Sequence, residues 1–411
     1  MVFIIAIIIK WVRYFSDVAM TLKVNGMPDQ ELRKFVAPEY VFGVGARKLV
    51  GQYAKKLGAR KILVVTDPGV IATGWTEDVT TALEQERLSF DIFSEVSPNP
   101  RGEEVMRGAE FYSAHGCNMI VAVGGGSPMD CAKGIGIVST NPGNILDYEG
   151  VDQVTAPIPP LICIPTTGGT SADVSQFAII TDLQEKVKIA IVSKAVVPDL
   201  ALIDPETLLS MSPYLTACTG MDALTHAIEA FVSNANSPMT DIHALEAIRL
   251  LAKHLVHSVK DPADLALRSK VMLASLQAGL AFSNAILGAT HAMAHSLGGY
   301  LDLPHGECNA ILLDHVCAFN ISAAPERFDA ITEALGVNLA GMVRPEREIA
   351  LLEKLRLIKR EVGIDRHLLE LGVQRTDLSQ LSRHAVADAC LVTNPRDATT
   401  RDIESIYEEA L

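Results

Sequence analysis

The chain has 411 residues, of which 49% are apolar and 20% are charged. This composition is typical of a folded protein with room for two domains, and it excludes an intrinsically disordered one. The net charge of −14 without a basic tract argues against nucleic acid or an anionic membrane as partner, and the seven cysteines, an odd number with no CxxC pair, indicate reduced thiols in the cytoplasm.

The N-terminal residues, MVFIIAIIIKWVRYF, differ in composition from the rest of the chain. Their apolar run from Val2 to Ile9 is much shorter than the roughly 20 residues that span a bilayer. Positive residues follow the run, whereas in a secretory signal they precede it. Three interpretations stay open: a translation start placed too early, with Met20 or Met27 as the true one, a peripheral membrane anchor, or an N-terminal strand. We favour the first and treat residues 1–30 as an extension.

From Phe42 to Ile203 the chain alternates short apolar runs with amphipathic stretches, which is the pattern of a parallel α/β sheet. The segment 186–193 alternates more cleanly and is predicted to be an added hairpin strand. The predicted strands are 61–67, 89–96, 118–126, 160–167 and 199–205, and helices are predicted at 79–86 and 103–115.

A glycine-rich turn, GGGSPMDCAKG from Gly124 to Gly134, joins the strand at 118–126 to a helix. Three successive glycines let the backbone approach a bulky anion, and the free amides of a helix N-terminus favour phosphate there. Ser127, Pro128 and Asp130 fit the N-cap, the first helical position and the third position of a capping box. The turn therefore predicts either a phosphate site or a tight strand-to-helix connection that needs no ligand.

Two other strand ends carry polar side chains. Asp67 closes the strand at 61–67, where its carboxylate could accept both hydroxyls of an adenosine ribose and repel a 2′-phosphate, favouring NAD over NADP. The alternative for Asp67 is a cap of the turn at Pro68 and Gly69. The segment Pro165 to Ser175, PTTGGTSADVS, could wrap a nucleotide or be a plain loop.

After Pro205 strand signals nearly vanish and helical spacing dominates. We expect helices at 216–232, 240–258, 265–282 and 289–300. Pro-Glu and Ser-Pro pairs indicate the boundary between two domains. The predicted domains are an α/β domain at 31–209 and an all-helical domain at 210–411. Any ligand is expected in the cleft between them.

The helical half contains a set of potential metal ligands. Asp222 and His226 are four residues apart, so on a helix both side chains leave one face, and His291 and His295 repeat that spacing. His305 follows His291 by 14 residues in a Leu-Pro-His-Gly turn. Because an apolar helix face has no structural need for two imidazoles, the pattern predicts an ion held by Asp222, His226, His291 and His305. One carboxylate and three imidazoles suit Fe²⁺, with Zn²⁺ as the alternative.

Four segments together resemble the iron-containing (group III) alcohol dehydrogenase family, and the similarity runs from about Phe35 to the C-terminus. They are GGGSPMDCAK, TTGGTSADVSQFAIITD, GMDALTHAIEAF and GATHAMAHSLGGYLDLPHGECNAIL. The resemblance implies an N-terminal Rossmann-like, parallel-sheet dinucleotide-binding domain and a C-terminal helical metal-binding domain, an arrangement called dehydroquinate synthase-like. It also implies NAD(P)-dependent oxidation of a small alcohol, or reduction of an aldehyde, and a homodimer or larger homo-oligomer.

The resemblance also implies roles for individual residues. His295 corresponds to a further active-site histidine, which could relay the alcohol proton; a packed residue that orients its neighbours is the alternative. Ser171 to Ser175 depart from the family's usual Gly-Ser-Glu-Val-Thr, which affects the details of nicotinamide contact. The positions that correspond to the family's dinucleotide contacts are Asp67, Asn99, Gly125, Gly126, Ser127, Asp130, Thr166, Thr170, Ser175 and Lys188.

A divalent ion that stabilises the alkoxide would let a hydride pass from the carbinol carbon to C4 of the nicotinamide. Two other functions stay open at this point. One is a zinc-dependent polyol dehydrogenase of the glycerol type, and the other is a non-catalytic protein that binds NAD or metal as a regulator.

Overall fold

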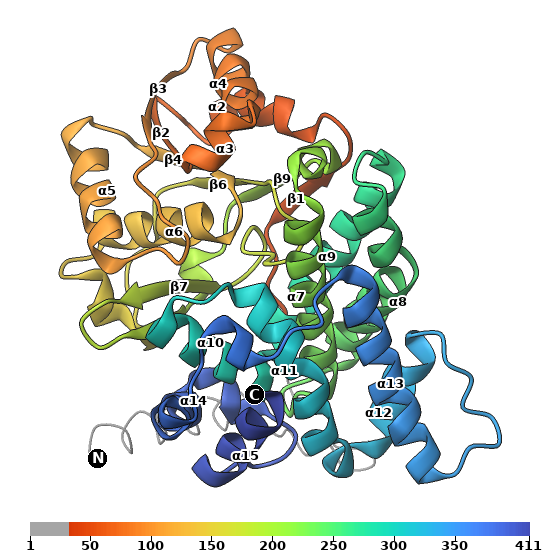
Figure 1. The fold of residues 1–411 in the computed structure, drawn as a ribbon. Coiled ribbons are helices and arrows are strands. Elements are labelled where there is room, and N and C mark those ends of the chain that lie inside the picture. The colour runs from red at the N-terminus through yellow and green to blue at the C-terminus, as the bar shows by residue number, and fades with distance from the viewer. Residues whose placement is uncertain (1–32) are drawn as a thin grey trace, which may run out of the picture.

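The computed structural model describes residues 33–411, so the predictions for residues 1–30 lie outside the described part of the chain. Figure 1 shows an α/β half that contains the main sheet and a second half built of helices. The main sheet is parallel, with strand order β1-β9-β6-β4-β2-β3. Its strands are β1 (Glu39–Phe42), β2 (Lys61–Val65), β3 (Ser89–Phe93), β4 (Met119–Gly124), β6 (Leu161–Pro165) and β9 (Leu200–Ile203).

The central strands are apolar at nearly every position because helices cover both faces of the sheet. In β2, Ile62 and Val64 face one core and Leu63 and Val65 face the other. Helices α2 (Val50–Lys56) and α4 (Trp75–Gln85) pack on the first face, and α5 (Gly102–Ala114) and α6 (Gly126–Thr140) on the second. The five predicted strands of this half and its parallel sheet are therefore confirmed.

A smaller sheet has the order β5-β8-β7, with β5 (Gly150–Val151), β7 (Phe177–Asp182) and β8 (Val187–Val192). β7 and β8 form an antiparallel hairpin, as predicted for residues 186–193. The partner strand β7 was not among the predicted strands. This hairpin lies against helix α10 and brings the α/β half into contact with the helical half.

The 3-10 helix Pro205–Ser210 follows the last strand, and all later elements in the described part of the chain are helical. The four helices predicted in this half are present. The longer helices are α7 (Pro213–Val232), α8 (Pro238–Lys260), α9 (Leu265–Ala285), α10 (Ala289–Leu301), α11 (His305–Asn320), α12 (Pro325–Ala334), α13 (Arg344–Val362), α14 (Leu378–Ala387) and α15 (Thr400–Ala410).

No single helix within residues 33–411 combines the length and apolar composition needed to cross a membrane. Helices α9 and α10 taken together have that length and composition, but the chain bends by 98° between them.

Candidate metal centre and cofactor pocket

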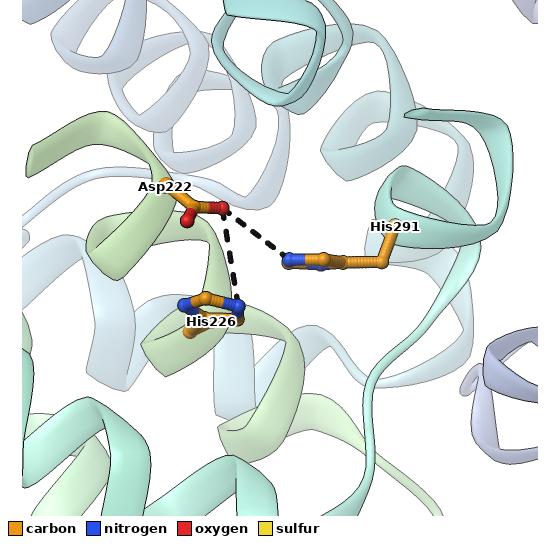
Figure 2. Close-up of side chains that lie close together, drawn as sticks. All are labelled: Asp222, His226 and His291. Carbon is orange, nitrogen blue, oxygen red and sulfur yellow. Dashed lines mark ion pairs between the residues drawn. The ribbon is translucent and has the colours of Figure 1, made fainter. Parts of the chain in front are cut away.

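Three helices bring the four predicted ligands together. Asp222 and His226 lie one turn apart on α7, and His291 extends toward them from the first turn of α10 (Figure 2). His305 is the first residue of α11, with Pro304 as its N-cap, so the predicted turn is in fact a helix start. Because the ring of a proline fixes its φ, Pro304 restricts the backbone directly before His305.

The ring nitrogens of all three histidines point to one carboxylate oxygen. The Nε2 atoms of His291, His305 and His226 lie 3.5, 3.7 and 3.9 Å from Oδ1 of Asp222. These distances are too long for hydrogen bonds. Ligand atoms that each lie about 2.1 Å from a tetrahedral ion are about 3.4 Å apart, so the His291 distance fits and the other two are longer by up to about 0.5 Å. One carboxylate and three imidazoles therefore fit a divalent cation.

Burial and mutual charge perturb the pKa values of this group. Burial lowers the pKa of His226 to about 4 and that of His305 well below its usual value, so both rings are neutral donors at neutral pH. Burial would raise the pKa of the Asp222 carboxyl, but the neighbouring histidines outweigh it and lower that pKa. Burial likewise lowers the pKa of His291, but the carboxylates of Asp222 and Glu229 raise it to about 9. The histidines thus keep the Asp222 carboxyl ionised, which is the form that can bind a cation.

Glu229 contacts the ring of His291 through Nδ1, whereas Asp222 lies on the Nε2 side. The sequence did not point to Glu229. Its Oε2 accepts from Nδ1 of His291 at 2.7 Å and from the amide of Gly288 at 3.0 Å, while Oε1 accepts from the amide of Thr290 at 2.6 Å. The bond from Nδ1 turns Nε2 toward Asp222, so Nε2 is the atom that could bind a cation once it gives up its hydrogen. The position of Glu229, three residues after His226 on α7, could have indicated that it shares their helix face.

His295 lies one turn beyond His291 and lines the same pocket. Its Nδ1 donates to Asp388 at 2.9 Å, and its ring stacks on His305 with centroids 5.2 Å apart. Asp388 comes from the segment after α14 and had no signal in the sequence. Because Asp388 holds Nδ1, it also fixes the orientation of the ring and so the direction in which Nε2 points.

The turn between β4 and α6 is too tightly packed against neighbouring residues for side chains in place of its glycines. A Cβ on Gly124, whose φ is +156°, would lie 2.5 Å from Cγ of Pro128. One on Gly125 or Gly126 would lie 3.0 or 3.1 Å from a threonine methyl group. The helix begins at Gly126 with Gly125 as N-cap and no side-chain cap, so the predicted capping box starting at Ser127 is wrong. The cause is the two glycines, Gly125 and Gly126, which let the helix begin two residues earlier than predicted.

Seven of the ten predicted cofactor residues line the pocket that holds the metal-ligand group, and three lie outside its lining. The seven are Asn99, Gly126, Ser127, Asp130, Thr170, Ser175 and Lys188. The other three sit at the carboxyl ends of parallel strands. Asp67 caps α3 (Pro68–Ala72) by accepting from the amide of Val70 at 2.9 Å, Gly125 is the N-cap of α6, and Thr166 is buried directly after β6.

Two lysines, the buried Lys133 and the partly buried Lys188, hold the pocket wall in place by hydrogen bonds. Lys188 donates to Oδ1 of Asn99 at 2.7 Å, and Nδ2 of Asn99 donates to Asp302 at the end of α10. Lys133, on α6, donates to the backbone of Ser175 and Phe177 and so fixes the loop opposite the glycine turn. Burial lowers the pKa of each lysine. Burial also raises the pKa of Asp130 to about 7, although Lys133 opposes the shift.

Two family models match the chain. The model described as iron-containing alcohol dehydrogenase matches residues 37–205, and that of the C-terminal part of the Fe-containing alcohol dehydrogenase family matches residues 216–411.

Individual relatives match over nearly the whole chain. A 1,3-propanediol dehydrogenase of Citrobacter freundii is 40% identical over 371 residues, covering 90% of this chain and 96% of the relative. An NAD-dependent methanol dehydrogenase of Bacillus methanolicus is 39% identical over 380 residues, covering 92% and 99%. The crystal structure of a 1,3-propanediol oxidoreductase superposes with a TM-score of 0.90 at 38% identity, covering 93% of this chain and all of that one.

Proposed function

The chain belongs to the iron-containing alcohol dehydrogenase family, and we propose that it interconverts a small alcohol and its aldehyde with NAD as the hydride carrier. One observation carries the proposal: the Nε2 atoms of three histidines converge on one oxygen of Asp222 in a pocket that is also lined by the glycine turn at Gly126. A metal centre that binds the alcohol oxygen and a turn that binds the cofactor phosphates, in one pocket, would bring the alcohol and the nicotinamide together for hydride transfer.

We assign the metal to Asp222, His226, His291 and His305, with Fe²⁺ as the proposed ion and Zn²⁺ as the alternative. Imidazoles bind a cation in their neutral form, so three of them and one carboxylate would leave the centre with a net positive charge, and mixed nitrogen and oxygen donors suit either ion. When bound, such an ion supplies a Lewis acid that polarises the oxygen of the alcohol or aldehyde.

The chain's own residues position the cofactor and move the proton. The free amides after Gly125 face the place where we assign the pyrophosphate, at a helix N-terminus that favours negative charge. Asp67, at the end of β2, would accept the ribose hydroxyls and repel a 2′-phosphate, which favours NAD over NADP. His295 is held by Asp388 through Nδ1, so its Nε2 is the atom assigned to take the alcohol proton.

The alternatives have less support. The matched relatives include alcohol, propanediol and methanol dehydrogenases, and neither they nor the described residues favour a zinc-dependent polyol enzyme or a non-catalytic regulator. The substrate is proposed only as a small primary alcohol or diol.

The decisive experiment is anaerobic purification with metal analysis, followed by NADH formation across primary alcohols and diols with Fe²⁺ or Zn²⁺ added back. We expect about one ion per chain and metal-dependent NADH formation. Asp222→Ala should lose both, and the matched control Asp397→Ala, an exposed aspartate, should lose neither. Nucleotide binding without NADH formation on any alcohol, in metal-replete protein, would contradict the proposal and favour the non-catalytic alternative.

We also propose a homodimer or larger homo-oligomer and a cytoplasmic location. The seven cysteines are all buried and unpaired within residues 33–411, in keeping with a reducing compartment. Light scattering during size-exclusion chromatography would test the oligomeric state, and a mass equal to one chain would contradict it.

A further inference from the structure

Asn309 is a fully buried amide that points at the proposed metal ligands. It lies on α11, one turn after His305. Its Nδ2 is 2.7 Å from Oδ1 of Asp222 and 3.2 Å from Nε2 of both His291 and His305. The amide therefore contacts three of the four atoms that would surround the ion, including the oxygen on which the imidazoles converge.

The contact with Asp222 is the strongest of the three. It is the shortest, and its acceptor is a charged carboxylate, which makes such a bond about twice as strong as a neutral one. The Nε2 lone pairs of His291 and His305 are the ones an ion would take, and once they are taken neither atom can accept from the amide. The second lone pair of Asp222 Oδ1 stays available, so Asp222 is the partner that Asn309 keeps when an ion is bound.

The other end of the amide shows that Asn309 is not there for packing. Its Oδ1 is buried and has no hydrogen-bond partner. An unsatisfied buried acceptor costs about 1–3 kcal/mol, a cost that a leucine of similar size would avoid. A polar residue is favourable at this position only if its Nδ2 end compensates for that cost.

We propose that Asn309 is a positioning residue of the metal centre: by donating to Oδ1 it fixes the Asp222 carboxylate and sets how tightly a divalent ion is held. The inference rests on the metal site proposed above and adds to it a residue that orients a ligand without being one. Groups that orient a metal ligand in this way typically change metal affinity by about 10- to 100-fold.

The test uses Co²⁺ as a spectroscopic probe and measures its affinity by competition with a coloured chelator. Asn309→Leu removes the donor at nearly constant volume and should weaken Co²⁺ binding by about 10- to 100-fold. Asn309→Ala should weaken it less, because the space it opens can hold a water molecule that donates to Asp222. A packing role gives the opposite order, since alanine would leave the larger cavity.

The matched control is Ile311→Ala, which truncates a buried apolar side chain on the same helix. It should lower the melting temperature of the metal-free protein and leave Co²⁺ affinity unchanged.

Three results separate the possibilities. Co²⁺ affinity in Asn309→Leu equal to that of the unsubstituted protein would overturn the inference and leave the metal site intact. A change in the d–d absorption of bound Co²⁺ that reports one ligand fewer would also overturn it, because Asn309 would then be a direct ligand. Failure of the unsubstituted protein to bind Co²⁺ would instead remove the proposed metal site itself.

Discussion

Glu229→Gln offers the sharpest test of how the metal centre is held. The carboxylate is 3% exposed and accepts three hydrogen bonds, from Nδ1 of His291 and from the amides of Gly288 and Thr290. Glutamine has almost the same shape but only one acceptor oxygen. If that oxygen faces His291, the new NH₂ group meets the Thr290 amide, and two donors face each other. If it faces Thr290, His291 must move its hydrogen to Nε2, the atom that faces Asp222.

Either outcome carries a cost that can be estimated. One buried hydrogen bond to a charged group is lost, worth about 1.5–3 kcal/mol, and the remaining bonds lose their charged acceptor. We expect a total of about 3–5 kcal/mol and a melting temperature lower by several degrees. Divalent-ion affinity should fall by about 10- to 100-fold, because a ligand's hydrogen-bond partner has been changed.

The assay pairs differential scanning calorimetry with chelator competition, on the metal-free and the metal-loaded protein. Glu110→Gln, at an exposed position on α5, serves as the matched control and should change neither quantity. If Glu229→Gln melts at the same temperature and binds the ion as tightly as the unsubstituted protein, the orienting role of Glu229 is refuted. A loss of stability with unchanged metal affinity would show that Glu229 stabilises the start of α10 but does not orient a metal ligand.

Three further predictions concern the pocket. His295→Ala should keep its metal, measured by elemental analysis, while kcat falls by about 10²- to 10⁴-fold through loss of a proton acceptor; loss of the metal would make His295 a ligand instead. Asp130 has a pKa raised to about 7 from 3.8, so the folded state binds more protons than the unfolded one and its stability falls as pH rises between those values. Asp130→Asn should therefore stabilise the protein at pH 8 by up to about 4 kcal/mol and less at pH 5, and equal gains in melting temperature at both would contradict the shift. Asp67→Ser should raise the ratio of kcat/KM with NADP to that with NAD by about tenfold, and an unchanged ratio would show that Asp67 only caps α3.

The sheet and the helical half could be predicted from periodicity because their residues are buried in regular patterns. β4 is apolar at every position since both its faces are covered, and this continuous run is readable in the sequence. β7 was missed although Phe177–Asp182 is largely apolar, because the hydroxyl-rich segment before it reads as a loop. The start of α6 was misplaced for a local reason: Ser127 is a good cap, but Gly125 and Gly126 admit a conformation that begins the helix earlier.

Some residues of the candidate site could be predicted because they are close in the sequence, and others could not because only the fold brings them together. Asp222 and His226, and His291 and His295, could be identified because a spacing of four residues on a helix is local. Asp388 could not, since it meets His295 across 93 residues of chain and only the packing of α14 beside α10 brings them together. Asn309 lay inside a recognised segment, yet its role depends on an amide orientation that no spacing encodes.

Helix α10 is the element that couples the two halves of the pocket. Its first turn presents His291 to Asp222, and its second presents His295 to the same cavity. Asp302, which directly follows the helix and has a φ of 54°, accepts from Asn99 and Arg101 of the α/β half. A shift of α10 along its axis would therefore move a proposed metal ligand, the proposed proton acceptor and the wall of the cofactor pocket together. Contacts at both ends, to Glu229 and to Asn99, oppose that shift, so we propose that this one helix, fixed at each terminus, would set the separation between the proposed ion and the nicotinamide.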